Sequence, residues 1–181
     1  EKDLVIAGNS QPIVTGGMSN FLQYKGISLR VNCSFTFDRD ILNNALASQL
    51  KAFNNPFDLN SLSPIDAYNY WTADGDNSVY PNPFDYLRAK IVDPFRTEQT
   101  LFQEDGSYFK INSITFSYSF NRNLIKSWGL NGIRLYATAS NLATFSNYSG
   151  PNPENVTALG RDGSGGYPIP RTFTLGLNVE F

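Results

Sequence analysis

The residue types that most often catalyse reactions or hold metals are sparse in this chain. It contains no His and a single Cys, Cys33, which removes the commonest general base, the commonest transition-metal ligand and any disulfide within the chain. Two acidic turns, 74–77 and 162–163, have the composition of calcium loops, but neither has EF-hand spacing. They are better interpreted as polar turns. We therefore expect no enzyme, no cofactor and no metal site.

Aromatic side chains are the chemistry that remains. Tyr70, Trp71 and Tyr80 lie in a segment rich in Asn, Asp and Pro. Aromatic rings in such a segment can stack on sugar rings or pack against a partner protein. For any one of these residues, packing of the segment onto itself is the simpler interpretation. We take the three as candidate contacts to a ligand or a partner.

Charge and composition narrow the class of protein. The chain has 14 Lys and Arg against 16 Asp and Glu, so its charge gives no reason to expect nucleic acid. Aromatic residues make up 14% and charged residues only 17%, a balance that suits strands with large exposed or lipid-facing sides. No apolar run approaches the roughly 20 residues of a membrane-spanning helix. A membrane protein made of this chain would therefore have to be a β-barrel.

The last residues alternate strictly between apolar and polar. This pattern predicts a strand over 171–181. Its apolar positions are Phe173, Leu175, Leu177, Val179 and Phe181. Chain ends of soluble proteins are usually frayed and polar. An apolar residue in the last position therefore indicates that this end is held in a sheet.

The same alternation predicts four further strands, at about 18–24, 27–38, 108–120 and 133–145. Phe109 and Ile111 fall on the opposite side from the apolar residues that follow them. This indicates either a bulge near Asn112 or a strand that starts outside the apolar belt.

Two long polar segments, 39–107 and 146–170, separate the strands and alternate with short turns. Helical spacing predicts one short helix over 41–50 in the first segment. Long loops at one end and short turns at the other are typical of outer-membrane barrels. The 39–107 segment is too long for an ordinary connection in a compact domain, which indicates either a functional loop or an element that the pattern does not reveal.

These features favour an all-β fold, the wall of an antiparallel up-and-down transmembrane β-barrel. The strands exceed the usual 5 to 6 residues, roughly the mode in soluble proteins, and their polar sides carry Ser, Thr, Asn and Gly. Bacterial barrels have an even number of strands, about 8 or more, so five strands indicate a piece of a larger barrel. A soluble carbohydrate-binding β-sandwich shows the same alternation and is the alternative. A small complete barrel would need three more strands within 39–107, where alternation is absent.

Several motifs occur in an order that resembles the C-terminal barrel portion of SusC/RagA-family TonB-dependent outer-membrane transporters. The motifs are 8–9, 24–26, 70–72, 108–118, 134–136, 141–145, 148–154 and 167–177. Together they cover nearly the whole chain. The sequence departs from the family at Asn152, where Asp is frequent, and at Asn82, where Arg is frequent.

The resemblance implies a barrel of about 22 strands, of which these are the last five. It also implies a plug domain that this chain lacks, a SusD-like lipoprotein lid, and TonB acting through the absent N-terminal part. The implied activity is energised import of a glycan or peptide across the outer membrane of a Gram-negative bacterium of the Bacteroidota. Residues 173–181 would then meet outer-membrane lipid and present the terminal strand to the barrel-assembly machinery. The 39–107 loop would contact the lid or the ligand.

Overall fold

The computed structural model describes residues 5–54, 64–84, 95–96, 98–163 and 169–181. The chain divides into two compact units. Unit 1 takes in the described residues of Glu1–Gln11, Arg39–Gly106 and Tyr148–Tyr167, and unit 2 those of Pro12–Asp38, Ser107–Asn147 and Pro168–Phe181. No helix in these described ranges is long and apolar enough to cross a membrane.

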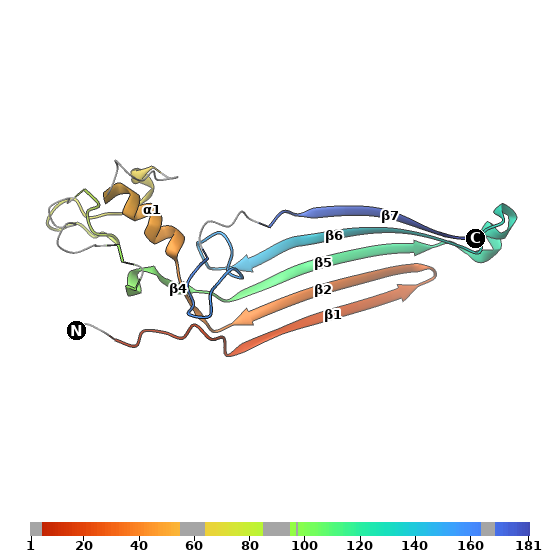
Figure 1. Ribbon diagram of the computed structural model, residues 1–181, viewed down its shortest axis with the longest axis horizontal. Coiled ribbons are helices and arrows are strands. Elements are labelled where there is room, and N and C mark those ends of the chain that lie inside the picture. Colours follow the sequence, from red (N-terminus) through yellow and green to blue (C-terminus); the bar gives the residue numbers. More distant parts are fainter. Residues whose placement is uncertain (1–4, 55–63, 85–94, 97, 164–168) are drawn as a thin grey trace. The chain divides into compact units, whose positions relative to one another are not determined.

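Unit 2 is built on one five-stranded antiparallel sheet with the order β1-β2-β5-β6-β7 (Figure 1). Its strands are β1 (Val14–Tyr24), β2 (Ile27–Phe37), β5 (Tyr108–Ser119), β6 (Gly132–Ser146) and β7 (Thr172–Glu180). Each strand pairs with the next long strand along the chain, which is an up-and-down arrangement. The expected antiparallel sheet is therefore confirmed.

β1 begins at Val14, earlier than position 18, because Gly16 and Gly17 belong to the strand rather than to a loop. Gly16 pairs with Phe35, and a Cβ on Gly16 would lie 2.8 Å from Cζ of the Phe35 ring. The aromatic ring thus occupies the space that the glycine leaves open. Because glycine pairs normally mark loops, the sequence pattern places the start of this strand at position 18, four residues too late.

A β-bulge at Asn112 explains the change of side within β5. Ser113 pairs with Asn32, but the next pair joins Ile111 to Cys33, so Asn112 is the extra residue. The bulge reverses the alternation and returns Ile111 to the apolar side. Of the two interpretations of the sequence, the structure shows the bulge.

One side of the sheet is apolar and exposed. A row that crosses four strands aligns Ile27, Tyr118, Leu135 and Leu177. Farther along β7, Phe173 is 73% and Leu175 81% exposed. Large apolar side chains rarely remain this exposed over a contiguous area in a soluble monomer.

The other side is a network of short polar side chains. The Ser28 and Ser117 hydroxyls lie 2.6 Å apart and are buried, and Thr115 and Thr138 make a similar pair at 3.0 Å. Arg134 donates from Nε and Nη2 to the Ser117 hydroxyl. Hydroxyl pairs across strands satisfy polar groups without adding charge. This side of the sheet is therefore polar but carries little charge.

The β5–β6 connection holds a short helical turn, α3 (Arg122–Ile125) followed by η3 (Lys126–Trp128). The side chain of Asn121 caps its start by accepting from the Asn123 N–H. Gly129, with φ of 76°, ends it in the left-handed conformation.

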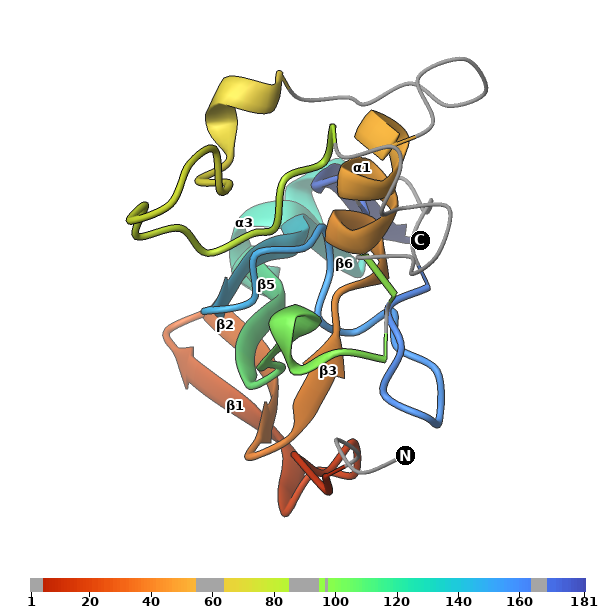
Figure 2. The ribbon, with the colours of Figure 1, turned by 90° about the vertical axis from the view of Figure 1, so that its left-hand side faces the viewer.

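Unit 1 contains α1 (Asn44–Asn54), the 3₁₀ turns η1 (Ile65–Ala67) and η2 (Thr100–Phe102), and a two-stranded sheet of β3 (Asp40–Leu42) and β4 (Gln103–Asp105). Figure 2 shows α1 together with the irregular segments of this unit. Its buried cluster consists of Ala47, Leu50, Phe95 and Phe102. In the described part of 39–107, β3 and β4 are the only strands, so three further barrel strands are absent there.

The helix begins at Asn44 and not at Ile41, because Ile41 and Leu42 pair with β4. Asn43 separates the two elements. Its Oδ1 accepts from the Leu46 N–H at 2.9 Å, which caps α1, and its amide donates to Glu104. Apolar spacing alone does not show where a strand gives way to a helix.

The β1–β2 turn provides a test of local backbone geometry. Lys25 and Gly26 both have positive φ, 45° and 84°, as a type I′ hairpin turn requires. A Cβ on Gly26 would lie 2.6 Å from the backbone oxygen of Ser119. Gly129 also has positive φ, but a Cβ there would meet nothing within 4 Å.

We predict that Gly26→Ala destabilises the full-length protein more than Gly129→Ala. Both changes carry the left-handed penalty of about 1–2 kcal/mol, and only the first adds a clash with backbone, about 1–3 kcal/mol more. Urea unfolding in detergent, followed by the gel shift between folded and boiled protein, measures the difference. Equal unfolding midpoints would contradict the predicted clash.

Candidate functional site

The three aromatic residues singled out in the sequence lie in one segment of unit 1, residues 64–84, here called the aromatic loop. Tyr70 and Tyr80 form a parallel β-bridge. The backbone N–H of Trp71 donates to the backbone carbonyl oxygen of Tyr80 at 2.8 Å. The backbone thus brings the three residues together, although 8 residues lie between Trp71 and Tyr80 in the sequence.

Their side chains have different environments. Tyr80 packs edge to face on Tyr68, with ring centroids 6.1 Å apart, and both rings lie against the buried cluster of unit 1. Burial, and secondarily the negative charge of Glu104, raises the pKa of the Tyr80 phenol. Tyr80 therefore fits the packing interpretation.

Trp71 is more open, and Tyr70 is half-buried. Trp71 is 38% exposed. Tyr70 packs edge to face on Phe84 at 6.0 Å, and Phe84 is itself 44% exposed. Sequence reasoning did not select Phe84, because it follows a Pro-rich stretch that is typical of an irregular connection. Trp71 and Phe84 are thus the exposed rings of the aromatic loop, and Tyr70 lies half-buried beside Phe84.

The acidic turn at 74–77 is a local cap within the aromatic loop. The Asp76 carboxylate accepts from the Thr72 hydroxyl and from the backbone N–H groups of Thr72 and Ala73. These hydrogen bonds, that of the Thr72 hydroxyl first, lower the pKa of Asp76. Across the described ranges, no three His, Cys, Asp or Glu side chains are grouped to hold a metal ion. The Asp76 carboxylate thus serves as the cap of this turn.

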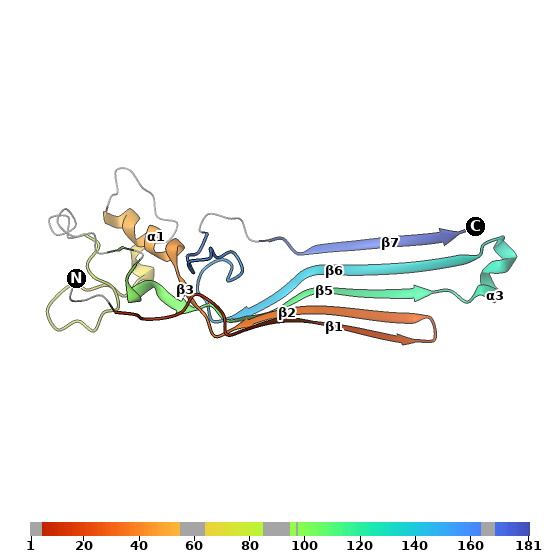
Figure 3. The same ribbon diagram turned by 60° about the horizontal axis from the view of Figure 1, so that its bottom comes forward.

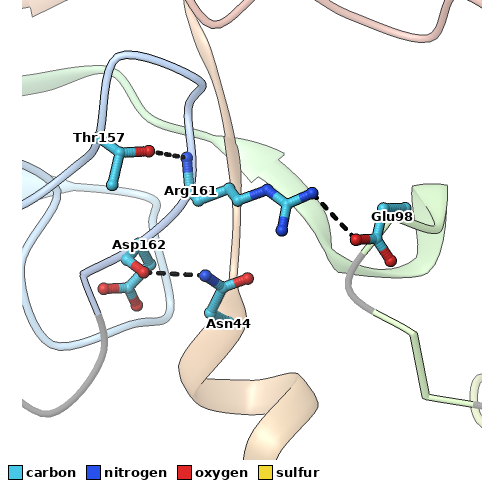
Figure 4. Close-up of polar contacts among 5 residues, drawn as sticks. All are labelled: Asn44, Glu98, Thr157, Arg161 and Asp162. Atoms are coloured by element: carbon cyan, nitrogen blue, oxygen red, sulfur yellow. Dashed lines mark hydrogen bonds and ion pairs between the residues drawn. The ribbon is translucent and has the colours of Figure 1, made fainter.

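Polar contacts hold the second long loop, 148–163, against the rest of unit 1 (Figure 4). Arg161 forms an ion pair with Glu98 at 2.9 Å, and its N–H donates to the Thr157 hydroxyl. The side-chain amide of Asn44, at the start of α1, donates to the backbone carbonyl oxygen of Asp162 at 3.0 Å. These contacts link the loop to the helix and to residue 98.

A buried phenol strengthens this arrangement. The Tyr148 hydroxyl donates to Asp162 Oδ2 at 2.6 Å, and both side chains are buried. Burial, then the hydrogen bond to Asp162, and then the charges of Asp162 and Glu104 raise the pKa of Tyr148 far above its usual range. Because the folded pKa is raised, this stabilisation is fully present below about pH 10 and is lost as the pH rises through the folded pKa.

We predict that Tyr148→Phe loosens loop 148–163 by about 1–3 kcal/mol at neutral pH, because buried Asp162 loses its phenol donor. Hydrogen exchange of the loop amides in the full-length protein measures the effect. Tyr70→Phe is the matched control, since no hydrogen bond of its hydroxyl is found in the described structure. In ¹³C-tyrosine NMR, the resonance lost in Tyr148→Phe should be the one that remains protonated above pH 10. Titration of that resonance at or below pH 10 would refute the assignment.

The apolar residues of the terminal strand lie on the exposed side of the sheet. Phe173, Leu175 and Leu177 pair with Ala139, Ala137 and Leu135 of β6. Val179 continues the row opposite Ile133, and Phe181 follows the end of β7 and is exposed. The free edge of β7 has no paired strand among the described residues. β7 therefore presents both an apolar side and an open hydrogen-bonding edge.

Sequence comparison relates this chain to receptors, although not to a protein-family model. No protein-family model matches the chain. It is 31% identical over 189 residues to the TonB-dependent receptor P3 of Formosa agariphila, and 29% identical over 185 residues to the TonB-dependent receptor P39 of the same organism. Each match covers 99% of this chain and 17% of the receptor. The chain thus spans about one fifth or less of the length of these relatives.

Comparison with solved structures shows the fold. A chain of the RagAB peptide transporter superposes with a TM-score of 0.71 at 23% identity, covering 97% of this chain and 18% of that one. The open-open state of the RagAB peptide importer gives 0.68 at 22% identity, with the same coverage. Nearly the whole chain is therefore similar in sequence to one part of TonB-dependent receptors, and it shares the fold of one part of a RagAB chain.

Proposed function

We propose that this chain forms part of the wall and the outer loops of a transporter that imports oligosaccharides or peptides across the outer membrane of a Gram-negative bacterium. Import would be energised through TonB, which would act on a part of the protein outside this chain, and a SusD-like lipoprotein would cover the outer end. The observation that carries the proposal is the match of 99% of the chain to TonB-dependent receptors.

The two sides of the sheet support a wall between lipid and an aqueous or plugged lumen. Burial of a large apolar side chain is worth about 1.5–3 kcal/mol, so the exposed row on β7 would be strongly stabilised in lipid. The opposite side, with its paired Ser and Thr hydroxyls, suits a polar lumen. Either kind of side also occurs on the sheets of soluble proteins, but their combination on long strands is typical of barrels.

The soluble β-sandwich has less support. A sandwich needs a second sheet packed on the apolar side of the first. Within its described residues, unit 2 holds a single sheet, and the other sheet of the chain is the short β3–β4 pair of unit 1. The relatives are receptors and the structural neighbours belong to an importer, which favours transport over catalysis.

A growth assay tests the proposed function directly. The gene for the full-length protein is deleted, and growth is followed on oligosaccharides and on peptides as sole nutrients. Loss of growth on one class, with the same loss after deletion of the TonB gene, supports the proposal. A full-length protein that stays in solution without detergent would contradict it.

The aromatic loop is the part of this chain that we assign to ligand or lid contact. Trp71 and Phe84 present exposed ring surface, and half-buried Tyr70 packs on Phe84. The segment carries Asp66, Asp74 and Asp76 without a Lys or Arg. Aromatic faces provide contact area to both sugar rings and protein side chains at a low cost in conformational entropy. Tyr80 would support this surface from beneath rather than form it.

We predict that Trp71→Ala weakens binding of substrate or lid by about 1–2 kcal/mol, roughly 5- to 30-fold, without lowering the amount of assembled protein. Val79→Ala is the matched control, since Val79 is an exposed apolar residue of the same loop. Calorimetry with the transported nutrient and copurification of the lid protein separate the two partners. If Trp71→Ala and Val79→Ala behave alike in both assays, Trp71 is not part of the contact surface.

We predict that Phe181→Ala lowers the amount of assembled outer-membrane protein more than the affinity for ligand. The reason is that Phe181 ends the apolar row that lipid and the assembly machinery would recognise. Phe145→Ala, an exposed aromatic on β6, is the control for loss of apolar surface alone. Assembly is measured from the gel shift of unboiled membranes, and a normal yield of Phe181→Ala would overturn this role.

A further inference from the structure

The turn between β5 and β6 carries apolar side chains that no described part of unit 2 covers. We call residues 121–129 the interfacial turn. Leu124 is 67% and Trp128 71% exposed. Leu124 lies in α3 and Trp128 ends η3, so both belong to one short turn. Two large apolar side chains this exposed on one turn favour a partner that is at least partly apolar.

The turn is firmly built, so this exposure is not a result of fraying. Asn121 caps its start, and Gly129 ends it with an N–H that donates to the Lys126 oxygen at 3.0 Å. Ile125 is 1% exposed and anchors the turn to the sheet. With Ile125 fixed inward, Leu124 and Trp128 are held outward.

Charge on the turn identifies the partner. Arg122 and Lys126 are its only charged residues, and both are exposed. They are four residues apart and each lies two residues from Leu124, so they share a side that differs from that of Leu124. An apolar side next to a cationic side is the pattern of a helix that lies in the headgroup region of a membrane. Phosphate groups complement the cations, and acyl chains complement the Leu and Trp.

The turn is also continuous with the apolar side of the sheet. It lies at the end of the sheet that carries the last residue of the chain (Figure 3). The backbone N–H of Asn131 donates to the backbone carbonyl oxygen of Glu180 at 2.8 Å, which ties the end of the turn to β7. Phe120 and Phe181, both exposed, lie at this end. Apolar surface therefore extends from the strands onto the turn.

We infer that the interfacial turn is a phospholipid-binding anchor of the short-turn end of the barrel, an inference that rests on the proposed membrane location of the sheet. Leu124 and Trp128 enter the acyl-chain boundary, where Trp is favoured at membrane interfaces. Arg122 and Lys126 extend to the phosphate groups, as long cationic side chains do at such boundaries. The anchor fixes the depth of this end of the sheet in the leaflet.

Spin labels test this arrangement in the full-length receptor, with its native cysteines replaced and the receptor held in bilayer discs of phosphatidylcholine and phosphatidylglycerol. A nitroxide is attached in Leu124→Cys, in Asn123→Cys as the control one position away, and in Leu177→Cys on the apolar side of β7. Collisions with oxygen report lipid, and collisions with a water-soluble nickel chelate report water. We expect an oxygen-to-nickel ratio several-fold higher at position 124 than at 123.

The control at position 177 separates this inference from the proposed function. A label at 177 that meets the nickel chelate freely would refute the membrane location itself. A lipid-exposed label at 177 with a water-exposed label at 124 would overturn the anchor alone. A label at 124 shielded from both probes would show a protein partner in place of lipid and would also overturn the anchor.

Two further variants test the roles of the named residues, each with the label kept at 124. Trp128→Ser should shift the ratio at 124 toward the value at 123. The pair Arg122→Gln and Lys126→Gln should remove any dependence of that ratio on the phosphatidylglycerol content. An unchanged ratio in Trp128→Ser, or an unchanged lipid dependence in the charge variant, would refute the assigned role.

Discussion

The antiparallel backbone ladder of the five long strands is the constraint on which the rest of unit 2 depends. Because successive side chains of a strand point to opposite sides, a fixed register decides at once which residues face together. The rows that result are apolar on one side, as in Ile27 to Leu177, and hydroxyl-rich on the other, as in Ser28 and Ser117. A slip of one residue would exchange the two sides. The bulge at Asn112 keeps the sides consistent where the sequence alone would reverse them.

The loops of unit 1 follow a different principle. They have little periodicity and are held by a small apolar cluster together with side-chain hydrogen bonds to backbone and carboxylate groups. Asn43 shows this most clearly, since its one side chain caps α1 and also donates to Glu104 and Ser149. Tyr148 and Asp162 act similarly from the second long loop. Such contacts give an irregular loop a defined surface, which is what recognition of a ligand or a lid requires.

The proposed functions of the two units are therefore complementary. Unit 2 would supply a wall whose sides match lipid and lumen, and its interfacial turn would set the depth of one end. Unit 1 would supply the surface that meets a partner, through exposed rings supported by buried ones. The same aromatic residue types would serve in lipid contact, in core packing and in the aromatic loop, so their role would follow from position rather than from identity.

The sequence by itself determined the antiparallel strands, the separation of apolar and polar sides, and the resemblance to TonB-dependent transporters. Strict alternation is a local property, and it survives in the sequence because each side of a long strand has one kind of neighbour. The part of the resemblance that rests on Tyr167 and Pro168 lies outside the described residues. The sequence did not show that β1 includes Gly16, because the Phe35 ring on the neighbouring strand β2 packs over this glycine.

Only the tertiary structure distinguished the environments of the aromatic residues. Tyr70, Trp71 and Tyr80 look equivalent in the sequence, yet Tyr80 packs on the core, whereas Trp71 is exposed and Phe84 joins Tyr70. The exposed pair on the interfacial turn was likewise separated from buried Ile125 only by the fold. The physical reason is that burial depends on contacts between residues far apart in the chain. Neither composition nor local spacing encodes those contacts.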